Sequence, residues 1–281
     1  MKIKELINYG RNMLNKNNID DSAIISKMLA EYILGLDRNK IIISEDKEVE
    51  ENEKERYYLG LIEIVQGMPI QYITNKQEFM GLNFYVDENV LIPQPDTETL
   101  VEEVINICKE KTENIKILDI CTGSGAIGIS VAKYIENSKV VLSDISKNAI
   151  EVAKKNAKDN KVEDKIEIIE SDMFENISDK FDIIVSNPPY IESEVISTLD
   201  KEVQNEPHIA LDGGEDGLKF YRVLAEQSKK YLNDNGTICL EIGYNQREAV
   251  EEILKECNYK NIYSKKDLSG NDRIVVAKKG E

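Results

Sequence analysis

Largely apolar runs of strand length alternate with longer amphipathic runs from about residue 114 to the end of the chain. The strand-like runs are residues 115–120, 139–145, 165–172, 181–186 and 237–243, and the helix-like runs are residues 126–135, 149–158 and 218–231. Such alternation is typical of a parallel sheet with helices on both faces, because crossover helices cover strands that are apolar on each side. The pattern predicts an α/β, doubly wound fold.

The C-terminal tail has a different pattern. Residues 261–279 contain two strand-like runs joined by a short polar turn. A short turn joins antiparallel strands, whereas a parallel pair needs a long crossover. We therefore expect at least one antiparallel strand in a mostly parallel sheet.

The N-terminal part has helical periodicity instead. Residues 20–36 place Ile24, Ile25, Met28, Leu29, Tyr32 and Ile33 at helical spacing, and a second helix follows the acidic stretch 44–56. The acidic stretch is expected to be a solvated helix face. Residues 78–86 predict a short hairpin that turns near Gly81. The expected boundary lies close to residue 85, which gives a helical domain with a connecting hairpin over residues 1–85 and an α/β domain over residues 86–281.

Composition narrows the class of protein. No apolar run approaches the ~20 residues that span a bilayer, and charges interrupt the apolar positions of the N-terminus, unlike a signal peptide. The four cysteines are widely spaced and His208 is the only histidine, which leaves no plausible zinc constellation. We therefore expect a soluble cytoplasmic protein with free thiols and no metal.

Charge argues against a nucleic-acid partner. The formal net charge is −17, of which residues 1–90 carry −5 and the remainder −12. Proteins that bind nucleic acid neutralise phosphates with a basic surplus, and neither part has one. The acidic total weakens a DNA or RNA hypothesis, although a local basic patch is compatible with it.

The loop after the first strand is rich in glycine. Gly123, Gly125 and Gly128 match G-x-G-x-x-G, and Asp144 ends the next strand 19 residues beyond Gly125. Glycines let the backbone approach a ligand closely, the following helix N-terminus presents free N–H groups, and the acid can accept ribose hydroxyls. The strand, loop, helix and acid together predict a nucleoside-type cofactor.

Both a nicotinamide dinucleotide and S-adenosylmethionine fit that pattern. Asp119 before the loop and the residues after the third strand favour S-adenosylmethionine. Asp172 can accept from an adenine amino group, while Met173 and Phe174 offer soft or flat packing. An ordinary core role is about equally compatible with Met173 and Phe174.

Strand 181–186 ends in Asn187, Pro188, Pro189 and Tyr190. Two prolines cannot donate to a sheet ladder, so the strand ends there. In a doubly wound sheet this corner faces the glycine loop across the ligand crevice. The Asn187 oxygen and the Pro188 carbonyl can hold both N–H bonds of a planar amide or amine while Tyr190 stacks on it, with little reorganisation. A plain loop corner is the alternative.

Seven stretches together resemble one family. They are residues 67–86, 90–102, 117–130, 186–191, 205–222, 240–243 and 268–276, including "IPQPDTE", "CTGSG", "NPPY", "LEIG" and "LSGNDRIVV". With the helical N-terminal part, the chain resembles the bacterial release factor glutamine methyltransferases (the PrmC/HemK family).

The resemblance implies a fold and an activity. The fold is the seven-stranded, mostly parallel sheet of class I S-adenosylmethionine-dependent methyltransferases, Rossmann-like, with a small N-terminal substrate-recognition domain. The activity is methyl transfer from S-adenosylmethionine to the side-chain amide of the glutamine in the Gly-Gly-Gln loop of peptide chain release factors. We expect a monomer that binds neither nucleic acid nor membrane.

The resemblance also implies site residues. Asn187, Pro188, Pro189 and Tyr190 are expected to bind the target glutamine, with Asn187, Pro188 and Tyr190 catalytic. The cofactor would be held by Cys121, Thr122, Gly123, Ser124, Gly125, Asp144, Met173 and Asn187. Asp172 joins this set because it can accept from an adenine amino group.

The chain departs from the family pattern at two positions. Cys121 stands where a glycine is usual, and we expect binding to survive if its backbone torsions are ordinary for an L-residue. Gln94 replaces the usual arginine, which puts any charged contact there in doubt. His208 is expected to have a surface or loop-packing role, and the acid-rich run 192–206 to form a lid or loop over the site.

Three other functions fit parts of the sequence. A nucleobase amino-methyltransferase has the same corner but needs a basic groove. A nicotinamide-dependent oxidoreductase has the same glycine loop but leaves the Asn-Pro-Pro-Tyr corner unexplained. A non-catalytic binding protein is disfavoured because Asn187 and Asp144 are intact.

Overall fold

The computed structural model describes residues 1–109 and 114–280. The chain divides into two compact units, the first formed by Met1–Asn75 with Asp200–Asn205 and the second by Lys76–Leu199 with Glu206–Glu281. Across the described residues, no helix is both long and apolar enough to cross a membrane.

The division falls earlier than the sequence suggested. The hairpin of β1 (Gln77–Phe79) and β2 (Leu82–Phe84) lies in the second unit, although the expected boundary near residue 85 placed it with the first. Phe79 and Phe84 are buried in the core of the second unit, where their rings contact each other edge to face. Burial of two phenylalanines fixes the hairpin to the α/β unit.

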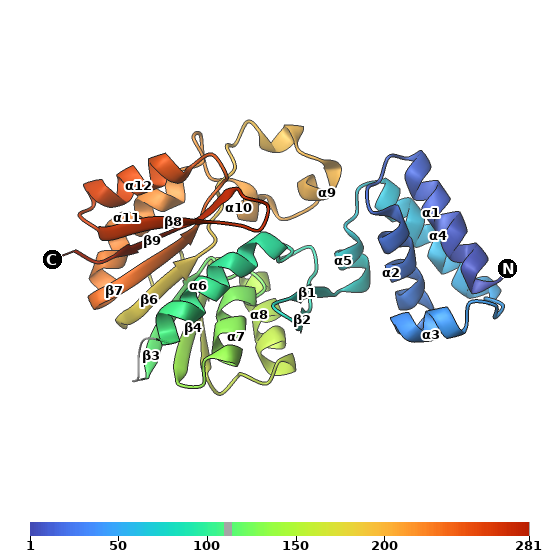
Figure 1. Cartoon of the computed structure of the whole chain (residues 1–281), viewed down its shortest axis with the longest axis horizontal. Helices are drawn as coiled ribbons and strands as arrows, with labels where there is room; N and C mark the ends of the chain where they lie inside the picture. The colour runs from blue at the N-terminus through green and yellow to red at the C-terminus, as the bar shows by residue number, and fades with distance from the viewer. Residues whose placement is uncertain (110–113, 281) are drawn as a thin grey trace. The chain divides into compact units, whose positions relative to one another are not determined.

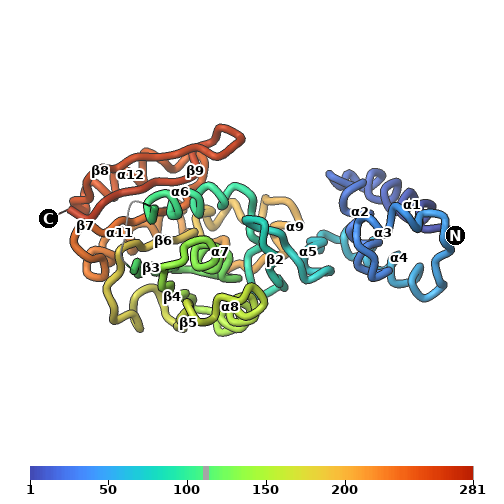
Figure 2. The backbone as a smooth tube through the Cα atoms, turned by 60° about the horizontal axis from the view of Figure 1, so that its bottom comes forward, coloured from blue at the N-terminus to red at the C-terminus, as the bar shows by residue number. Residues whose placement is uncertain are grey.

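The second unit is built on a seven-stranded sheet of order β5-β4-β3-β6-β7-β9-β8. Figure 1 shows β7, β6, β3 and β4 side by side within it. Its strands are β3 (Ile115–Ile120), β4 (Ser138–Asp144), β5 (Ile166–Glu170), β6 (Phe181–Ser186), β7 (Leu232–Glu241), β8 (Lys260–Lys266) and β9 (Asp272–Lys278). β9 is antiparallel to both β7 and β8, whereas the other pairs are parallel. The predicted mostly parallel sheet with an antiparallel tail is confirmed, and Figure 2 shows β5 and β8 at its opposite edges.

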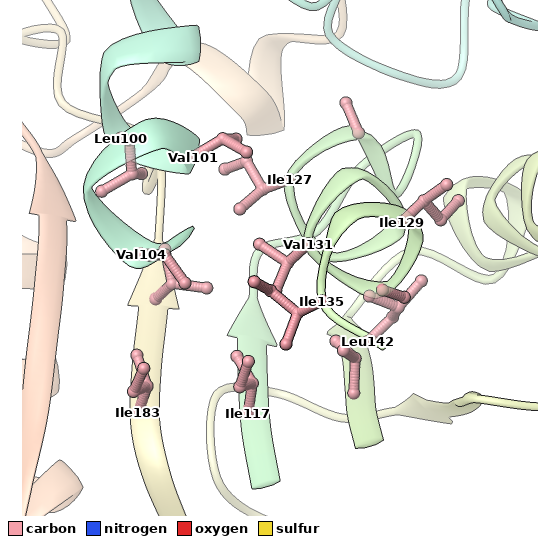
Figure 3. Close-up of a cluster of buried hydrophobic side chains, with 14 of the residues drawn as sticks. Leu100, Val101, Val104, Ile117, Ile127, Ile129, Val131, Ile135, Leu142 and Ile183 are labelled. Carbon is pink, nitrogen blue, oxygen red and sulfur yellow. The ribbon is translucent and has the colours of Figure 1, made fainter. Parts of the chain in front are cut away.

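Helices cover both faces of this sheet. The helices α6 (Glu98–Lys109), α7 (Ala126–Tyr134) and α8 (Lys147–Asp159) pack on one face, and α11 (Lys219–Tyr231) and α12 (Arg247–Glu256) pack on the other. Neighbours along a strand point to opposite faces. Ile117 therefore lies in the core beneath α6, α7 and α8, which we call the first core, and Leu118 lies in the core beneath α11 and α12, which we call the second core. Figure 3 shows side chains of α6 and α7 above Ile117 and Ile183. Burial on both faces explains why the central strands β3 and β6 are largely apolar, whereas the edge strands β5 and β8 carry exposed polar residues.

Strand order brings two distant loops together. β3 lies between β4 and β6, and Ile120, the last residue of β3, pairs with Ser186, the last residue of β6. The glycine loop and the Asn-Pro-Pro-Tyr corner therefore leave adjacent strand ends, as the sequence predicted. This edge is the topological switch point, where ligands bind in open α/β sheets.

The first unit is helical. It contains α1 (Ile3–Lys16), α2 (Ser22–Leu34), α3 (Arg38–Ile43), α4 (Glu51–Val65), α5 (Ile70–Thr74) and α9 (Lys201–Gln204). Leu6, Leu29 and Leu61 are buried in its core beside Tyr57, whose hydroxyl donates to the Ser26 carbonyl at 3.0 Å. The helices predicted over residues 20–36 and after the acidic stretch are confirmed as α2 and α4. Three shorter helices, η1 (Pro95–Thr97), η2 (Ile196–Thr198) and α10 (His208–Leu211), belong to the second unit.

Candidate active site

A cavity of about 250 Å³ opens at the carboxyl ends of β3, β4, β5 and β6. Its walls come from the loops after those strands, from the connector before η1 and from the segment around α10. The expected site residues among its lining are Cys121, Gly123, Asp144, Asp172, Met173, Asn187 and Pro189. The structure therefore gathers residues of both predicted motifs around one space.

Asp119 anchors the glycine loop from below. Its carboxyl is buried, and Oδ2 accepts a hydrogen bond from Thr122 Oγ1 at 2.6 Å and another from the Gly128 backbone at 2.9 Å. Burial raises the pKa of Asp119 to about 7, although the Thr122 and Gly128 bonds oppose the shift. Asp119 holds the loop in shape and does not line the cavity.

Three residues of the loop after β3 have left-handed backbone torsions. The φ angles are +60° at Cys121, +54° at Gly123 and +82° at Gly125. A Cβ added at Gly123 would meet no atom within 4 Å, whereas one added at Gly125 would lie 2.7 Å from Ile129 Cδ1. Gly123 thus leaves open space beside the cavity, and Gly125 allows close packing of the loop on α7.

The backbone torsion at Cys121 does not meet the condition that the sequence analysis attached to this position. Binding was expected to tolerate this cysteine if its torsions were ordinary for an L-residue, and they are not. The chain must turn sharply at the end of β3, and the half-buried Cys121 packs against the second core. Burial also raises the pKa of the Cys121 thiol, so the group stays neutral.

Asp144 closes the other side of the loop. Its Oδ2 accepts from the Gly123 backbone and its Oδ1 from the Ser146 backbone, each at 2.9 Å. Burial raises the pKa of Asp144, while these two backbone bonds oppose the shift. Each carboxylate oxygen has a second lone pair, so both can accept further hydrogen bonds from a ligand in the cavity.

The residues after β5 divide between cavity and core. Asp172 is exposed at the cavity, and Met173 lines the cavity while it packs in the second core with φ at +46°. Phe174 is buried outside the lining and stacks on Tyr231 with ring centroids 4.8 Å apart. The core alternative therefore holds for Phe174, whereas Met173 lies in both environments.

The Asn-Pro-Pro-Tyr corner reaches the cavity through Asn187 and Pro189. Asn187 Nδ2 donates to Thr97 Oγ1 at 3.4 Å. Pro188 is buried outside the lining, and the Tyr190 carbonyl accepts from Gln246 Nε2 at 2.9 Å. Burial raises the pKa of the Tyr190 phenol. Of the loop residues, Thr122, Ser124 and Gly125 also lie outside the lining.

Comparison with known proteins agrees with this architecture. Residues 96–215 match the model of the methyltransferase small domain, and residues 5–74 match that of the PrmC N-terminal domain. A release factor glutamine methyltransferase of Clostridium acetobutylicum is 43% identical over 284 residues, which covers 100% of this chain and 99% of the relative. The chain belongs to the release factor glutamine methyltransferase family.

Two further comparisons also cover most of the chain. The release factor glutamine methyltransferase of Clostridium botulinum is 42% identical, and the match covers 99% of this chain and 100% of the relative. A methyltransferase structure from Pyrococcus furiosus superimposes with a TM-score of 0.53 at 20% identity, over 72% of this chain and 90% of the other. The structural likeness supports the methyltransferase fold alone.

The remaining sequence expectations for this family member concern its periphery. Gln94 is exposed, and its Nε2 donates to the Ile92 carbonyl at 3.1 Å. His208 is exposed and its Nδ1 lies 4.0 Å from Asp212 Oδ2, which confirms a surface role. The lid role of residues 192–206 stays a prediction.

Sequence reasoning missed a polar cluster behind Asn187. It consists of Asp96 and Thr97 of η1, Glu241 at the end of β7 and Arg273 of β9. Arg273 Nη2 lies 3.1 Å from Asp96 Oδ2. Each member falls in a stretch that carries the family resemblance, and that was the signal available. No sequence signal showed that these residues lie close together, because their proximity depends on the order of β6, β7 and β9 in the sheet.

Proposed function

We propose that this protein transfers a methyl group from S-adenosylmethionine to the side-chain amide nitrogen of the Gly-Gly-Gln glutamine in peptide chain release factors. The observation that carries the proposal is that Asn187, the loop residues Cys121 and Gly123, and Asp144 at the end of β4 line one cavity in a chain of this family. The enzyme class is then an S-adenosylmethionine-dependent protein-(glutamine-N5) methyltransferase.

The cavity has the chemistry that this cofactor requires. In the proposal, the free lone pairs of Asp144 accept the ribose hydroxyls, and Asp172 accepts from the adenine amino group. The backbone between Cys121 and Gly125 supplies close approach, because Gly123 leaves open space at the cavity. Met173 adds a soft apolar surface. When bound, S-adenosylmethionine would supply an electrophilic methyl group to the amide nitrogen, with S-adenosylhomocysteine as the leaving group and the displaced amide proton released to water.

The Asn-Pro-Pro-Tyr corner addresses the weak point of the reaction. An amide nitrogen is a poor nucleophile because its lone pair is delocalised into the carbonyl. Asn187 Oδ1 and the Pro188 carbonyl would accept the two N–H bonds, and their fixed positions stabilise the charge that develops on nitrogen. Pro189 sets the backbone, and Tyr190 would stack on the planar amide.

The proposal also assigns the partner and the place of action. We propose that the helical first unit recognises a release factor and that the second unit, which includes the β1–β2 hairpin, carries the chemistry. A release factor is a cytoplasmic protein, so the enzyme would act in the cytoplasm. We further propose that it acts as a monomer and binds neither a membrane nor a nucleic acid. Light scattering of the purified chain tests the monomer.

The decisive experiment uses methyl-labelled S-adenosylmethionine with release factor, DNA and RNA in separate reactions. We expect label in release factor alone, located at the Gly-Gly-Gln glutamine by peptide mass spectrometry. Asn187→Ala should reduce transfer by about 10²–10³-fold, the loss typical when one preorganised oxyanion-type contact is removed. Asn106→Ala is the matched control, because Asn106 is exposed on α6 and lies outside the cavity.

Two outcomes would contradict the proposal. Label in nucleic acid but not in release factor would make the enzyme a nucleobase methyltransferase. Transfer by Asn187→Ala at the rate of Asn106→Ala would remove Asn187 from the mechanism.

A further inference from the structure

A buried carboxyl group lies directly behind the Asn-Pro-Pro-Tyr corner. Glu241, the last residue of β7, is 2% exposed, and its Oε2 has no hydrogen-bond partner among the described residues. Burying a carboxylate is costly unless neighbours stabilise it. A hydrophobic residue would fill the same space without that cost, so the position calls for a specific role.

The carboxylate faces the residue that would bind the substrate. Hydrogen bonding from the Thr97 hydroxyl and, more weakly, from the Asn187 amide opposes the rise that burial causes in the pKa of Glu241. Thr97 is itself buried, and its Oγ1 accepts from Asn187 Nδ2 at 3.4 Å. Asn187 is the member of this group that also lines the cavity. The three side chains thus connect the interior of the unit to the cavity wall.

An asparagine amide has an orientation problem that this arrangement solves. Its oxygen only accepts and its nitrogen only donates, and the two are nearly identical in shape. The Thr97 hydroxyl alone does not determine whether the oxygen or the nitrogen of Asn187 faces it, because a hydroxyl both donates and accepts. An ionised carboxylate only accepts, so Thr97 donates its hydrogen bond to Glu241 and its oxygen is left to accept from Asn187. The nitrogen of Asn187 is then held inward.

We propose that Glu241 is a positioning residue that fixes, through Thr97, the orientation of the Asn187 amide, so that Oδ1 faces the cavity. The inference rests on the proposed function only in assigning Oδ1 to the target amide. Glu241 touches neither substrate nor cofactor, since it does not line the cavity.

Burial, and after it the neighbouring polar and charged groups, determine the pKa of Glu241. Arg273 is buried, and its Nη2 lies 3.1 Å from Asp96 Oδ2 and 3.0 Å from Asp267 Oδ2, so its charge is shared between two acids. Burial raises the pKa of Glu241 to about 7, Thr97 and Arg273 oppose the rise and Asp96 adds to it. Glu241 therefore ionises close to neutral pH.

The other titratable groups facing Glu241 are the phenols of Tyr190 and Tyr221. Burial raises the pKa of both, so they stay neutral while Glu241 titrates. Below about pH 7, Glu241 gains a proton and can donate as well as accept, and the Asn187 amide loses its fixed direction.

The first test measures kcat for methyl transfer to release factor against pH in three proteins. We expect the wild-type kcat to rise with pH and to level off above about pH 7. Glu241→Gln should be slower by roughly 10–100-fold at pH 8, the scale of a small misplacement, without that rise and with an unchanged Kd for S-adenosylmethionine. Glu103→Gln is the control, because Glu103 is equally buried but bonds to Tyr263 and Lys265.

Two substitutions at Thr97 test whether its hydroxyl links Glu241 to Asn187. Thr97→Val removes the hydroxyl and should match Glu241→Gln in kcat and in pH profile. Thr97→Ser keeps the hydroxyl and should restore the wild-type rate and profile. If Thr97 had only a structural role, Thr97→Val would lower the free energy of unfolding but would keep the pH dependence of kcat.

The second test needs no activity. The side-chain amide signal of Asn187 in a nitrogen–proton NMR spectrum, identified by its loss in Asn187→Ala, should shift with an apparent pKa near 7. The shift should vanish in Glu241→Gln and persist in Glu103→Gln. No titration in the wild type, or a Glu241→Gln variant with wild-type kcat and profile, would overturn the positioning role. Titration without methylation of release factor would instead contradict the proposed function and leave the positioning role supported.

Discussion

Two non-glycine residues at the cavity have left-handed backbone torsions, Cys121 with φ at +60° and Met173 with φ at +46°. The left-handed region costs an L-residue roughly 1–2 kcal/mol because Cβ crowds the following carbonyl oxygen. Residues in such conformations persist where the surrounding structure determines them, and they cluster at ligand sites. Met173 lies in the second core and Cys121 packs against it, which offsets part of that cost.

Replacing Cys121 by glycine and by alanine separates backbone strain from packing. Both variants lose the thiol, but only alanine keeps the Cβ that is strained at this torsion. We expect Cys121→Gly to exceed Cys121→Ala in free energy of unfolding by about 1 kcal/mol, measured by urea denaturation. Equal stability of the two variants would contradict a strained Cys121.

At the scale of elements, Asn156 of α8 ties three segments together. Its Oδ1 accepts from the Tyr85 backbone at 2.7 Å, and its Nδ2 donates to the carbonyls of Tyr85 and Ser124, each at 2.9 Å. Tyr85 follows the hairpin and Ser124 lies in the glycine loop. One buried amide therefore holds the hairpin end and the cofactor loop against α8.

Asn156→Leu keeps the size of the side chain but leaves three backbone groups without partners. We expect a loss of at least about 3 kcal/mol in the free energy of unfolding, since each buried unsatisfied group costs about 1–3 kcal/mol. The Kd for S-adenosylmethionine should rise because the loop loses its support. Asn160→Leu is the comparison, because the Asn160 amide bonds the Asn83 and Asn156 carbonyls at a more exposed position. Equal losses in the two variants would refute a special role for Asn156.

At the scale of the whole molecule, protons couple to folding through two buried acids. Burial raises the pKa of Asp119 and of Glu241 to about 7, well above the ordinary values of unfolded carboxyl groups. Between those values the folded state holds protons that the unfolded state releases. Stability is therefore fully present at low pH and falls as pH rises toward 7. Surface acids with lowered pKa, such as Asp216, are ionised in both states above about pH 5 and drop out of this window.

Asp119→Asn should weaken that pH dependence. The asparagine oxygen can accept from Thr122 and Gly128, and its nitrogen would replace Oδ1, which has no hydrogen-bond partner among the described residues. We expect the wild type to lose more stability than Asp119→Asn between pH 5.5 and pH 8, by up to a few kcal/mol at about 1.4 kcal/mol per pKa unit. Urea unfolding followed by circular dichroism at both pH values measures the difference. Parallel losses would show that Asp119 ionises normally.

The sequence alone determined the features that depend on local pattern. Apolar period and length gave the strands and the helices α2, α4, α7, α8 and α11, whereas α1, α6 and α12 were not predicted. The glycine spacing gave the loop before α7, and the prolines gave the end of β6. Strand order in a doubly wound sheet is also a general rule, so the meeting of Cys121 and Asn187 at one edge was predictable.

Only the tertiary structure decided which side chains meet. The boundary moved to residue 75 because Phe79 and Phe84 pack in the α/β core, and Cys121 took a left-handed torsion because the turn and the core require it. Thr97 and Glu241 come from segments far apart in sequence and contact Asn187 through the order of strands. Contacts of this kind leave no periodic trace in a sequence, since burial and long-range packing produce them.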